Sequence, residues 1–365
     1  MTALSPQALD GTVLVVGCGL IGTSVGLALR QHDVDVVLHD TLPGHAEVAA
    51  SMGAGRLLSD DVDPLLVVVA VPPSSSAAVV AESLARWPDA LVTDVTSVKS
   101  AIQDAVDGGP GADRFAGGHP MAGSERSGPT AASAQLFEGR PWVVTPGTTT
   151  RPAALDAVVD LALHVGAVPI VMDPTAHDRA VALVSHVPQV MSTLTAARLN
   201  DAEGNDLSLS GPGLRDTTRI AASDPSLWVQ ILAANGPAIT SVLSAYRDDL
   251  DAVIAALDSP DAPGSRRAVA EAIAGGNAGV ERLPGKHGSA KRFSTLVVMV
   301  SDVPGELARL LTEIGELGVN MEDLRLEHSP GAQFGLAEIA VLPEVEHRLV
   351  TELEARGWKI AGENA

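Results

Sequence analysis

The stretch VLVVGCGLIG, residues 13–22, decides the fold, because its G-x-G-x-x-G turn follows directly on a short apolar run. Gly17 would make the turn from a strand into a helix, Gly19 would let the backbone approach a pyrophosphate, and Gly22 would pack the helix against a sheet. The pyrophosphate would sit at the helix N-terminus, where free N–H groups favour an anion. The turn therefore predicts a dinucleotide site, to which Leu20 and Ile21 contribute.

An acidic residue closes the second apolar run, as in dinucleotide-binding folds. Asp40 stands eighteen residues beyond Gly22. Its carboxylate would accept hydrogen bonds from the adenosine ribose hydroxyls and repel a 2′-phosphate, so we expect NAD rather than NADP. Val71 and Pro72, at the end of the third apolar run, are expected to contact the same cofactor.

The composition limits the kind of protein this can be. At 365 residues the chain exceeds one ordinary core, so we expect two or three domains. The net charge is −21, from 45 acidic and 24 basic residues, which makes nucleic acid and anionic membranes poor partners. No run of eighteen apolar residues and no apolar leader occurs, so a soluble, cytoplasmic protein is expected. The single cysteine, Cys18, is expected to pack inside the glycine turn rather than to react.

Short Val-rich runs alternate with helical stretches in the first half of the chain, which predicts a doubly wound parallel sheet of Rossmann type in residues 1–174. From residue 175 to 282 the strands stop, and apolar residues recur at helical spacing. We therefore expect an all-helical second domain, followed by a linker at 283–291. The expected strands are residues 13–16, 34–38, 65–71, 91–95, 142–144 and 168–172.

The last block, residues 292–365, predicts the order βαββαβ of a ferredoxin-like α+β sandwich. Its stretches DVPGEL (302–307) and GVNME (318–322) resemble the ACT family of amino-acid-sensing domains. The resemblance implies an aromatic amino acid effector, tyrosine first, bound near Pro304, Gly305 and Asn320. We expect a helix from Pro304 that Asp302 caps, with Asn320 on the following strand. A sandwich used only for dimerisation is the alternative.

Polar residues that follow the strands are the candidates for chemistry, because ligands of doubly wound sheets bind beyond the carboxyl ends of the strands. The stretch DVTSVK (94–99) places Ser97 in such a loop, where it would orient a substrate or cap a helix. The stretch GGHPMAGSE (117–125) places His119 in another loop. Because histidine titrates near neutral pH, His119 can take the proton of a hydroxyl whose carbon gives up hydride.

The helical region carries a second set of polar motifs. SHVPQ (185–189) opens it, and DTTRIAASDPSLW (216–228) follows directly after Arg215. Arg215 and Arg219 are guanidinium groups on an acidic protein, and their fork of donors suits bidentate recognition of a carboxylate. Surface ion pairing is the alternative, above all for Arg215.

Together these motifs resemble the prephenate/arogenate dehydrogenase family of tyrosine biosynthesis over residues 13–255. The resemblance implies a homodimer that uses NAD to convert prephenate to 4-hydroxyphenylpyruvate by oxidative decarboxylation. It makes His119 the base for the ring hydroxyl, which Ser97 helps to orient. Ser185 would contact substrate or nicotinamide, and Arg219 would clamp a substrate carboxylate. Four further matching residues would line or gate the pocket: Ser124, Glu125, Arg215 and Asp216.

One position departs from the pattern of some prephenate-specific members, since Gln189 stands where they have a second histidine. Glutamine is neutral at every pH, so the substrate side chain would meet a different partner there. Prephenate is the expected substrate and arogenate the alternative. More distant alternatives are a hydroxy-acid dehydrogenase, which commonly uses a lysine instead, and a non-catalytic regulator that binds NAD and an amino acid. No metal is expected.

Overall fold

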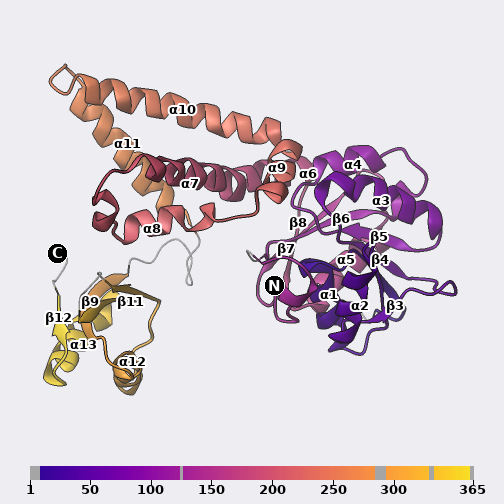
Figure 1. The fold of residues 1–365 in the computed structure, drawn as a ribbon, viewed down its shortest axis with the longest axis horizontal. Coiled ribbons are helices and arrows are strands. Elements are labelled where there is room, and N and C mark those ends of the chain that lie inside the picture. Colours follow the sequence, from indigo (N-terminus) through magenta and orange to yellow (C-terminus); the bar gives the residue numbers. More distant parts are fainter. Residues whose placement is uncertain (1–8, 124–125, 284–292, 329–332, 362–365) are drawn as a thin grey trace. The chain divides into compact units, whose positions relative to one another are not determined.

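The computed structural model describes residues 9–123, 126–283, 293–328 and 333–361. The chain divides into two compact units, each with its own interior. The first comprises Met1–Asp201 and Thr217–Arg247, and the second Ala202–Asp216 and Asp248–Ala365. Figure 1 shows the elements of both units along the chain. The three domain boundaries expected from the sequence stay a prediction.

A five-stranded parallel sheet forms the centre of the first unit, in the order β3-β2-β1-β4-β5. Chain order reverses between β1 and β4, beside the glycine turn, which is where doubly wound sheets bind ligands. The predicted Rossmann-type sheet is thereby confirmed. The strands are β1 (Val13–Val16), β2 (Val36–His39), β3 (Arg56–Leu57), β4 (Leu66–Val69) and β5 (Leu91–Asp94).

Both faces of this sheet are covered, which explains why its strands are runs of apolar residues without polar alternation. Val13 and Val15 point into one core, while Leu14 and Val16 point into the other. The first core contains residues of α1 (Leu20–Arg30), α2 (Pro43–Ser51) and α5 (Pro152–His164). The second contains residues of α3 (Pro73–Arg86) and α4 (Ser100–Val106).

A second, three-stranded sheet contains β6 (Ala116–Pro120), β7 (Pro141–Pro146) and β8 (Val168–Val171). Because β6 runs antiparallel to β7, the expectation that all strands are parallel was wrong here. His119 lies on β6 opposite Val143, so its expected place in a loop was also wrong. The sequence of β6, AGGHP, contains no β-branched residue and no Phe, Tyr or Trp, and therefore gave no strand signal.

The helical part of the first unit begins with α6 (Pro174–Val181) and α7 (Val187–Arg198), joined by a π-helical turn, Ala182–His186. Pro188 accounts for this turn, because a proline lacks the N–H of an α-helical bond and its ring crowds the carbonyl of Val184. Two short 3₁₀ segments precede α6 in the chain, η1 (Ala112–Arg114) and η2 (Pro129–Ala131). Two more follow α7, η4 (Leu199–Asp201) and η6 (Arg219–Ala221). The helix α9 (Pro225–Ala234) then leads into α10 (Gly236–Asp258), which belongs to the first unit as far as Arg247.

Among the described residues, one helical segment, Pro174–Asp201, is long and apolar enough to cross a membrane, and α9 with α10 passes the same test only as a sharply bent pair. Length and composition alone are weak evidence, since the core helix of a soluble protein has the same properties. The segment carries buried His177 and Asp178, and both are hydrogen bonded to the α/β part of the unit. These two hydrogen bonds hold the first turns of the segment against the α/β part, while one third of its apolar window is buried.

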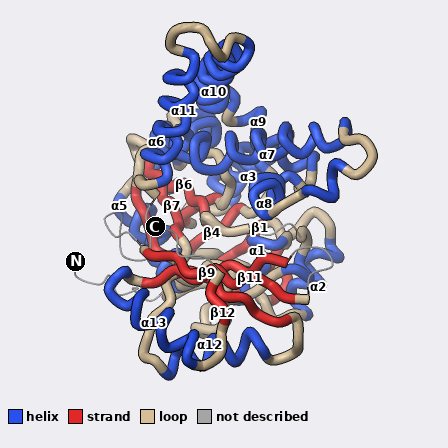
Figure 2. The backbone as a smooth tube through the Cα atoms, turned by 90° about the vertical axis from the view of Figure 1, so that its left-hand side faces the viewer, coloured by secondary structure: helices blue, strands red, loops and turns tan. Residues whose placement is uncertain are grey.

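The second unit contains α11 (Ser265–Val280) and an antiparallel sheet in the order β10-β11-β9-β12, with α12 (Glu306–Glu316) and α13 (Pro343–Ala355) packed on it (Figure 2). This is the predicted ferredoxin-like topology. Its strands are β9 (Ser294–Ser301), β10 (Asp323–His328), β11 (Phe334–Val341) and β12 (Lys359–Ile360). It also includes η5 (Asp206–Leu209) and most of α8 (Pro212–Thr218).

Three details around α12 differ from expectation. The helix begins at Glu306 rather than Pro304, and its cap is Gly305 rather than Asp302. Gly305 has a φ of +95°, a left-handed conformation that glycine adopts without strain. Asn320 precedes β10 instead of lying on it, and its amide donates to Glu322 at 3.3 Å.

Candidate active site

The glycine turn has the shape of a dinucleotide cradle. Gly17 has a φ of +101°, and a Cβ atom there would lie 2.4 Å from the carbonyl oxygen of Ala70. A Cβ atom at Gly22 would lie 2.0 Å from the carbonyl oxygen of Gly17. At Gly19, by contrast, a Cβ atom would meet nothing within 4 Å, so space remains in front of α1, which begins at Leu20. Two glycines thus close the turn, and the third leaves room for an anion.

Asp40 lies directly against this turn. Its Oδ2 accepts the backbone N–H of Cys18 at 2.7 Å, and its Oδ1 accepts that of Leu42 at 2.8 Å. Each carboxylate oxygen keeps a lone pair, so Asp40 can hold the turn and still accept from ribose hydroxyls. Burial, followed by the nearby Asp40 charge, raises the pKa of the Cys18 thiol to about 12. Cys18 is therefore a packing residue, as expected.

His119 lies at the ligand edge of the sheet. A bridge between Val92 and Phe115 continues the parallel order from β5 to the start of β6. The C-terminal end of β6 therefore points to the same edge as those of β1 and β4, where the glycine turn stands. Ser97 is half-buried in the turn after β5, at that same edge.

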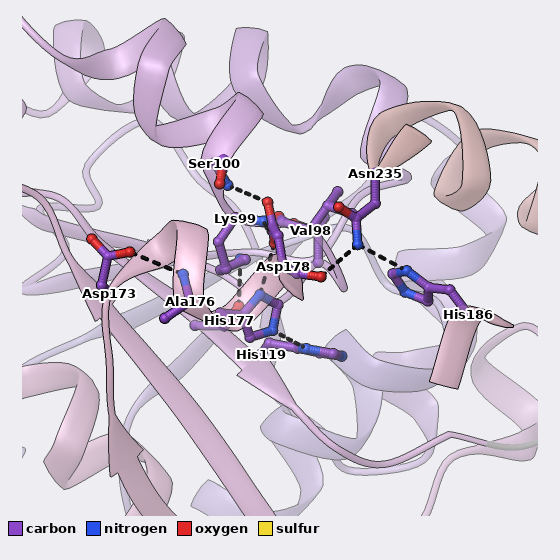
Figure 3. Close-up of polar contacts among 12 residues, drawn as sticks. Val98, Lys99, Ser100, His119, Asp173, Ala176, His177, Asp178, His186 and Asn235 are labelled. Atoms are coloured by element: carbon purple, nitrogen blue, oxygen red, sulfur yellow. Dashed lines mark hydrogen bonds and ion pairs between the residues drawn. The ribbon is translucent and has the colours of Figure 1, made fainter. Parts of the chain in front are cut away.

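A chain of hydrogen bonds runs inward from His119 (Figure 3). His119 Nδ1 lies 2.8 Å from His177 Nε2, and His177 Nδ1 lies 2.8 Å from Asp178 Oδ1. Asp178 also accepts the backbone N–H groups of Lys99 at 2.8 Å and Ser100 at 2.9 Å. Those two groups open α4, whose cap is therefore a carboxylate from α6 rather than Ser97. The alternative role of Ser97 as the cap of this helix was therefore wrong.

The strand that carries His119 is held by a buried ion pair. Lys99 Nζ contacts the carboxylate of Asp94 and donates to the carbonyl of Gly118 at 2.6 Å. Thr96 also donates to Asp94, from its backbone and its hydroxyl. Lys99 is buried and bonded to Asp94 and Gly118, so it is not placed as the proton-transferring lysine that hydroxy-acid dehydrogenases commonly use. A buried pair fully supplied with partners fixes the position of the backbone before His119.

A second buried histidine, His186, lies at the end of the π-helical turn before α7 and belongs to the same cluster. The amide nitrogen of Asn235 donates to the carbonyl of Asp178 at 2.8 Å and to Nδ1 of His186 at 3.1 Å. The ring of His186 packs edge-on against Trp228, with 6.2 Å between centroids. Asn235, which ends α9, thereby connects the junction of α9 and α10 to α6 and the π-helical turn.

The electrostatics favour the neutral rings of His119 and His186. Burial, and after it His177, Lys99 and His186, hold the pKa of His119 well below 6.5, against the opposing effect of Asp178. Burial lowers the pKa of His186 to about 4. For Asp178, burial favours the neutral acid, but the hydrogen bonds it accepts outweigh this and lower its pKa. At neutral pH the cluster therefore holds neutral His119 and His186 rings beside a carboxylate.

The other expected site residues are placed as follows. Ser185 is half-buried in the π-helical turn, and Gln189 is buried on α7, where its amide donates to the hydroxyl of Ser223 at 3.2 Å. Arg219 is exposed on η6, which packs against α7. Val71 and the more exposed Pro72 end β4 before α3. Arg215 and Asp216 belong to the second unit, and Ser124 and Glu125 lie outside the described residues.

Four contributors to the site escaped the sequence analysis: His177, Asp178, Asn235 and the pairing of Lys99. A histidine and an aspartate side by side in an apolar helical stretch were the only available signal. Within the described ranges, no group of three or more histidine, cysteine or acidic side chains could hold a metal ion.

Comparisons with known proteins identify the family of this chain. Two family models match, the prephenate dehydrogenase nucleotide-binding domain over residues 25–171 and the dimerization domain over 173–271. A probable prephenate dehydrogenase of Streptomyces niveus, NovF, is 36% identical over 95% of this chain and 98% of its own. Prephenate dehydrogenase from Aquifex aeolicus, solved with hydroxyphenyl propionate and NAD+, is 26% identical over 76% of this chain and 100% of its own, with a TM-score of 0.65. Synechocystis arogenate dehydrogenase is 26% identical over 73% of this chain and 99% of its own, with a TM-score of 0.60.

Proposed function

This chain belongs to the prephenate dehydrogenase family, and we propose that it converts prephenate to 4-hydroxyphenylpyruvate and CO₂. It is an NAD-dependent dehydrogenase, since it carries the family's nucleotide-binding domain and resembles an enzyme solved with NAD+. Its substrate is a small molecule, and it carries the family's dimerization domain. Asp40, in contact with the glycine turn, supports NAD over NADP as the cofactor.

The position of His119 at the ligand edge of the sheet, with its ring held by His177, is the observation that carries the mechanism, and its lowered pKa favours the neutral ring. A positioned neutral histidine can take the proton of the substrate's ring hydroxyl. Bound NAD supplies the acceptor for the hydride that leaves the same carbon. The ring carboxylate then departs as CO₂, its bonding electrons make the ring aromatic, and His119 returns the proton to the resulting phenolate oxygen.

Other residues would position the substrate around this base. Ser97, in the turn after β5, would orient the ring hydroxyl, and Ser185 would contact the substrate or nicotinamide from the π-helical turn. Arg219 would bind a substrate carboxylate through paired N–H donors. Its support is the packing of η6 on α7, which carries Gln189 and directly follows the turn with Ser185.

Arogenate is the second candidate substrate, because Gln189 suits it as well as prephenate. Gln189 replaces the histidine of some prephenate-specific members, and its buried amide is oriented by Ser223. A neutral amide can partner either the keto group of prephenate or the amino group of arogenate. Prephenate remains the principal candidate, since NovF, which is similar over 95% of this chain, is a probable prephenate dehydrogenase.

Steady-state assays with prephenate and with arogenate, each with NAD and with NADP, test the proposal. We expect the highest kcat/KM for prephenate with NAD. A higher value for arogenate would identify the second candidate as correct, and turnover of neither substrate would overturn both. Equal use of NADP would remove Asp40 from the ribose site.

We further propose that an aromatic amino acid, tyrosine first, regulates the enzyme by binding the C-terminal sandwich. The support is the ACT resemblance and the left-handed Gly305, which presents a side-chain-free cap at the start of α12. We also propose that the enzyme is a homodimer and that it is cytoplasmic. The net negative charge and the single cysteine are in keeping with that location.

A further inference from the structure

We propose that His177, anchored by Asp178, is a positioning residue that fixes the proton of His119 on Nδ1 and leaves Nε2 as the atom that accepts the substrate's proton. The inference rests on the role of His119 as the general base. It concerns a different property, however, which is the tautomer of the resting ring. That property can be measured without any turnover.

Asp178 fixes which atom donates in each hydrogen bond of the Asp178–His177–His119 series. A carboxylate only accepts hydrogen bonds, and Asp178 accepts from two backbone N–H groups as well as facing His177 Nδ1 at 2.8 Å. These contacts favour the ionised carboxylate. The proton between Asp178 and His177 therefore resides on Nδ1 of His177.

The consequence passes through the His177 ring to His119. A neutral ring protonated on Nδ1 presents a lone pair at Nε2, and Nε2 of His177 lies 2.8 Å from Nδ1 of His119. One of these two nitrogens must donate, so His119 carries its proton on Nδ1. Its Nε2 then has a free lone pair. In the opposite tautomer Nε2 would carry the proton, and the ring could not act as a base there.

The surroundings hold this arrangement in place. His177 is fully buried, and its ring meets that of His119 nearly at right angles, 5.0 Å between centroids. The charged or titratable groups around His119 are His177, Lys99, His186 and Asp178. Of these, Lys99 is committed to Asp94 and Gly118, and His186 accepts from Asn235. Only the His177–Asp178 pair is hydrogen bonded to the ring of His119 in the described structure.

The same pair would serve during the reaction. When His119 Nε2 takes the hydroxyl proton, the ring becomes an imidazolium whose Nδ1–H still donates to His177. The negative charge of Asp178 favours that cation. The proton leaves again through Nε2, to the phenolate oxygen, so neither His177 nor Asp178 changes its protonation.

The test compares two substitutions at one position. His177→Leu removes the acceptor for His119 Nδ1–H, whereas His177→Gln keeps an amide oxygen within reach of it while its NH₂ group can face Asp178. Asp173→Asn is the matched control on the same helix, because Asp173 caps α6 through Ala176 at 2.9 Å and asparagine caps equally well. Thermal unfolding of all variants verifies that each is folded.

The primary readout is the ¹⁵N NMR spectrum of histidine-labelled, substrate-free enzyme, with His119 assigned by its loss in His119→Asn. We expect a protonated Nδ1 and an unprotonated Nε2 in the wild type, the control and His177→Gln, and loss of this preference in His177→Leu. In parallel, kcat should fall by about 10² or more in His177→Leu, with unchanged NAD affinity and partial recovery in His177→Gln.

A protonated Nε2 in the wild type, or full kcat in folded His177→Leu, would overturn the inference. Failure of the proposed function looks different. The wild type would then show the expected tautomer but no turnover of prephenate or arogenate.

Discussion

His119 can act as a base only while its ring is neutral, and its burial beside His177 and Lys99 favours that form. Asparagine at this position would keep a polar group of similar size but could not accept a proton. We expect His119→Asn to lower kcat by about 10² to 10⁴ while NAD binds as before. Steady-state rates together with NAD titration by fluorescence would check this. Unchanged kcat would remove His119 from the mechanism.

The pH profile follows from the same residue. A base that must be neutral loses activity as the pH falls through its pKa, and the pKa of His119 lies well below 6.5. The wild-type kcat/KM should therefore stay level from neutral pH down past 6.5 and decline only in more acidic solution. A decline already centred at or above pH 6.5 would contradict the environment described for His119.

Arg219 is a second single residue whose proposed role can be tested, since its one guanidinium group would bind a substrate carboxylate. Arg219→Ala should raise the KM for the substrate by about 10- to 150-fold, the value of a charge-assisted hydrogen bond, with little change in NAD affinity. Arg198→Ala is the control, because Arg198 is exposed on α7 and pairs with Asp201. Equal effects of the two substitutions, or none for Arg219, would move the carboxylate site elsewhere.

At the scale of elements, the turn between β1 and α1 separates folding from cofactor binding. A Cβ atom at Gly22 would lie 2.0 Å from a backbone oxygen, whereas one at Gly19 would meet only open space. Gly22→Ala should therefore lower Tm, since overpacking of this kind costs about 1 to 3 kcal/mol. Gly19→Ala should leave Tm unchanged and weaken NAD binding.

Calorimetric unfolding and NAD titration of these two variants make the comparison. If Gly19→Ala bound NAD as tightly as the wild type, the pyrophosphate would not pass over that residue.

The elements show what the sequence could and could not reveal. Val-rich runs such as β1 and β4 were predictable because a covered parallel strand needs apolar residues on both faces. The strand β6 was not, because AGGHP has no strand propensity and pairs through its backbone with β7. In the C-terminal sandwich the order of strand-like and helical stretches predicted the topology, and the structure shows one face of β9 and β11 buried.

The candidate site likewise contains residues that the sequence could predict and contacts that it could not. His119 and the glycine turn were visible because short motifs carry them. The contacts of His119 were not, since His177 lies 58 residues further along the chain and Asn235 a further 57 residues from Asp178. Sequence spacing does not predict contacts between residues so far apart in the chain. They depend on how α6 packs against the start of α4.

At the scale of the whole molecule, the regulatory proposal depends on a C-terminal sandwich with a core of its own. That core is built from residues of β9, α12, β11 and α13, together with Val319 and Trp358. If tyrosine binds there, deletion of residues 292–365 should leave catalysis largely intact but remove the inhibition. A ligand can change activity only by binding two conformations unequally, and such couplings are typically about 1 to 3 kcal/mol.

Calorimetry of the intact protein with tyrosine, and rates of both forms with and without it, would measure this effect. Absence of binding, or equal inhibition of the shortened enzyme, would leave the sandwich with a structural role only.

The central claim is that one site couples hydride removal from prephenate to the loss of CO₂, with His119 as the base. The most direct measurement is the stoichiometry of a reaction of purified protein with prephenate and NAD, following NADH, CO₂ and 4-hydroxyphenylpyruvate together. Equal amounts of all three are expected, and His119→Asn should slow the three equally. NADH without CO₂, or no reaction with prephenate, would contradict the claim.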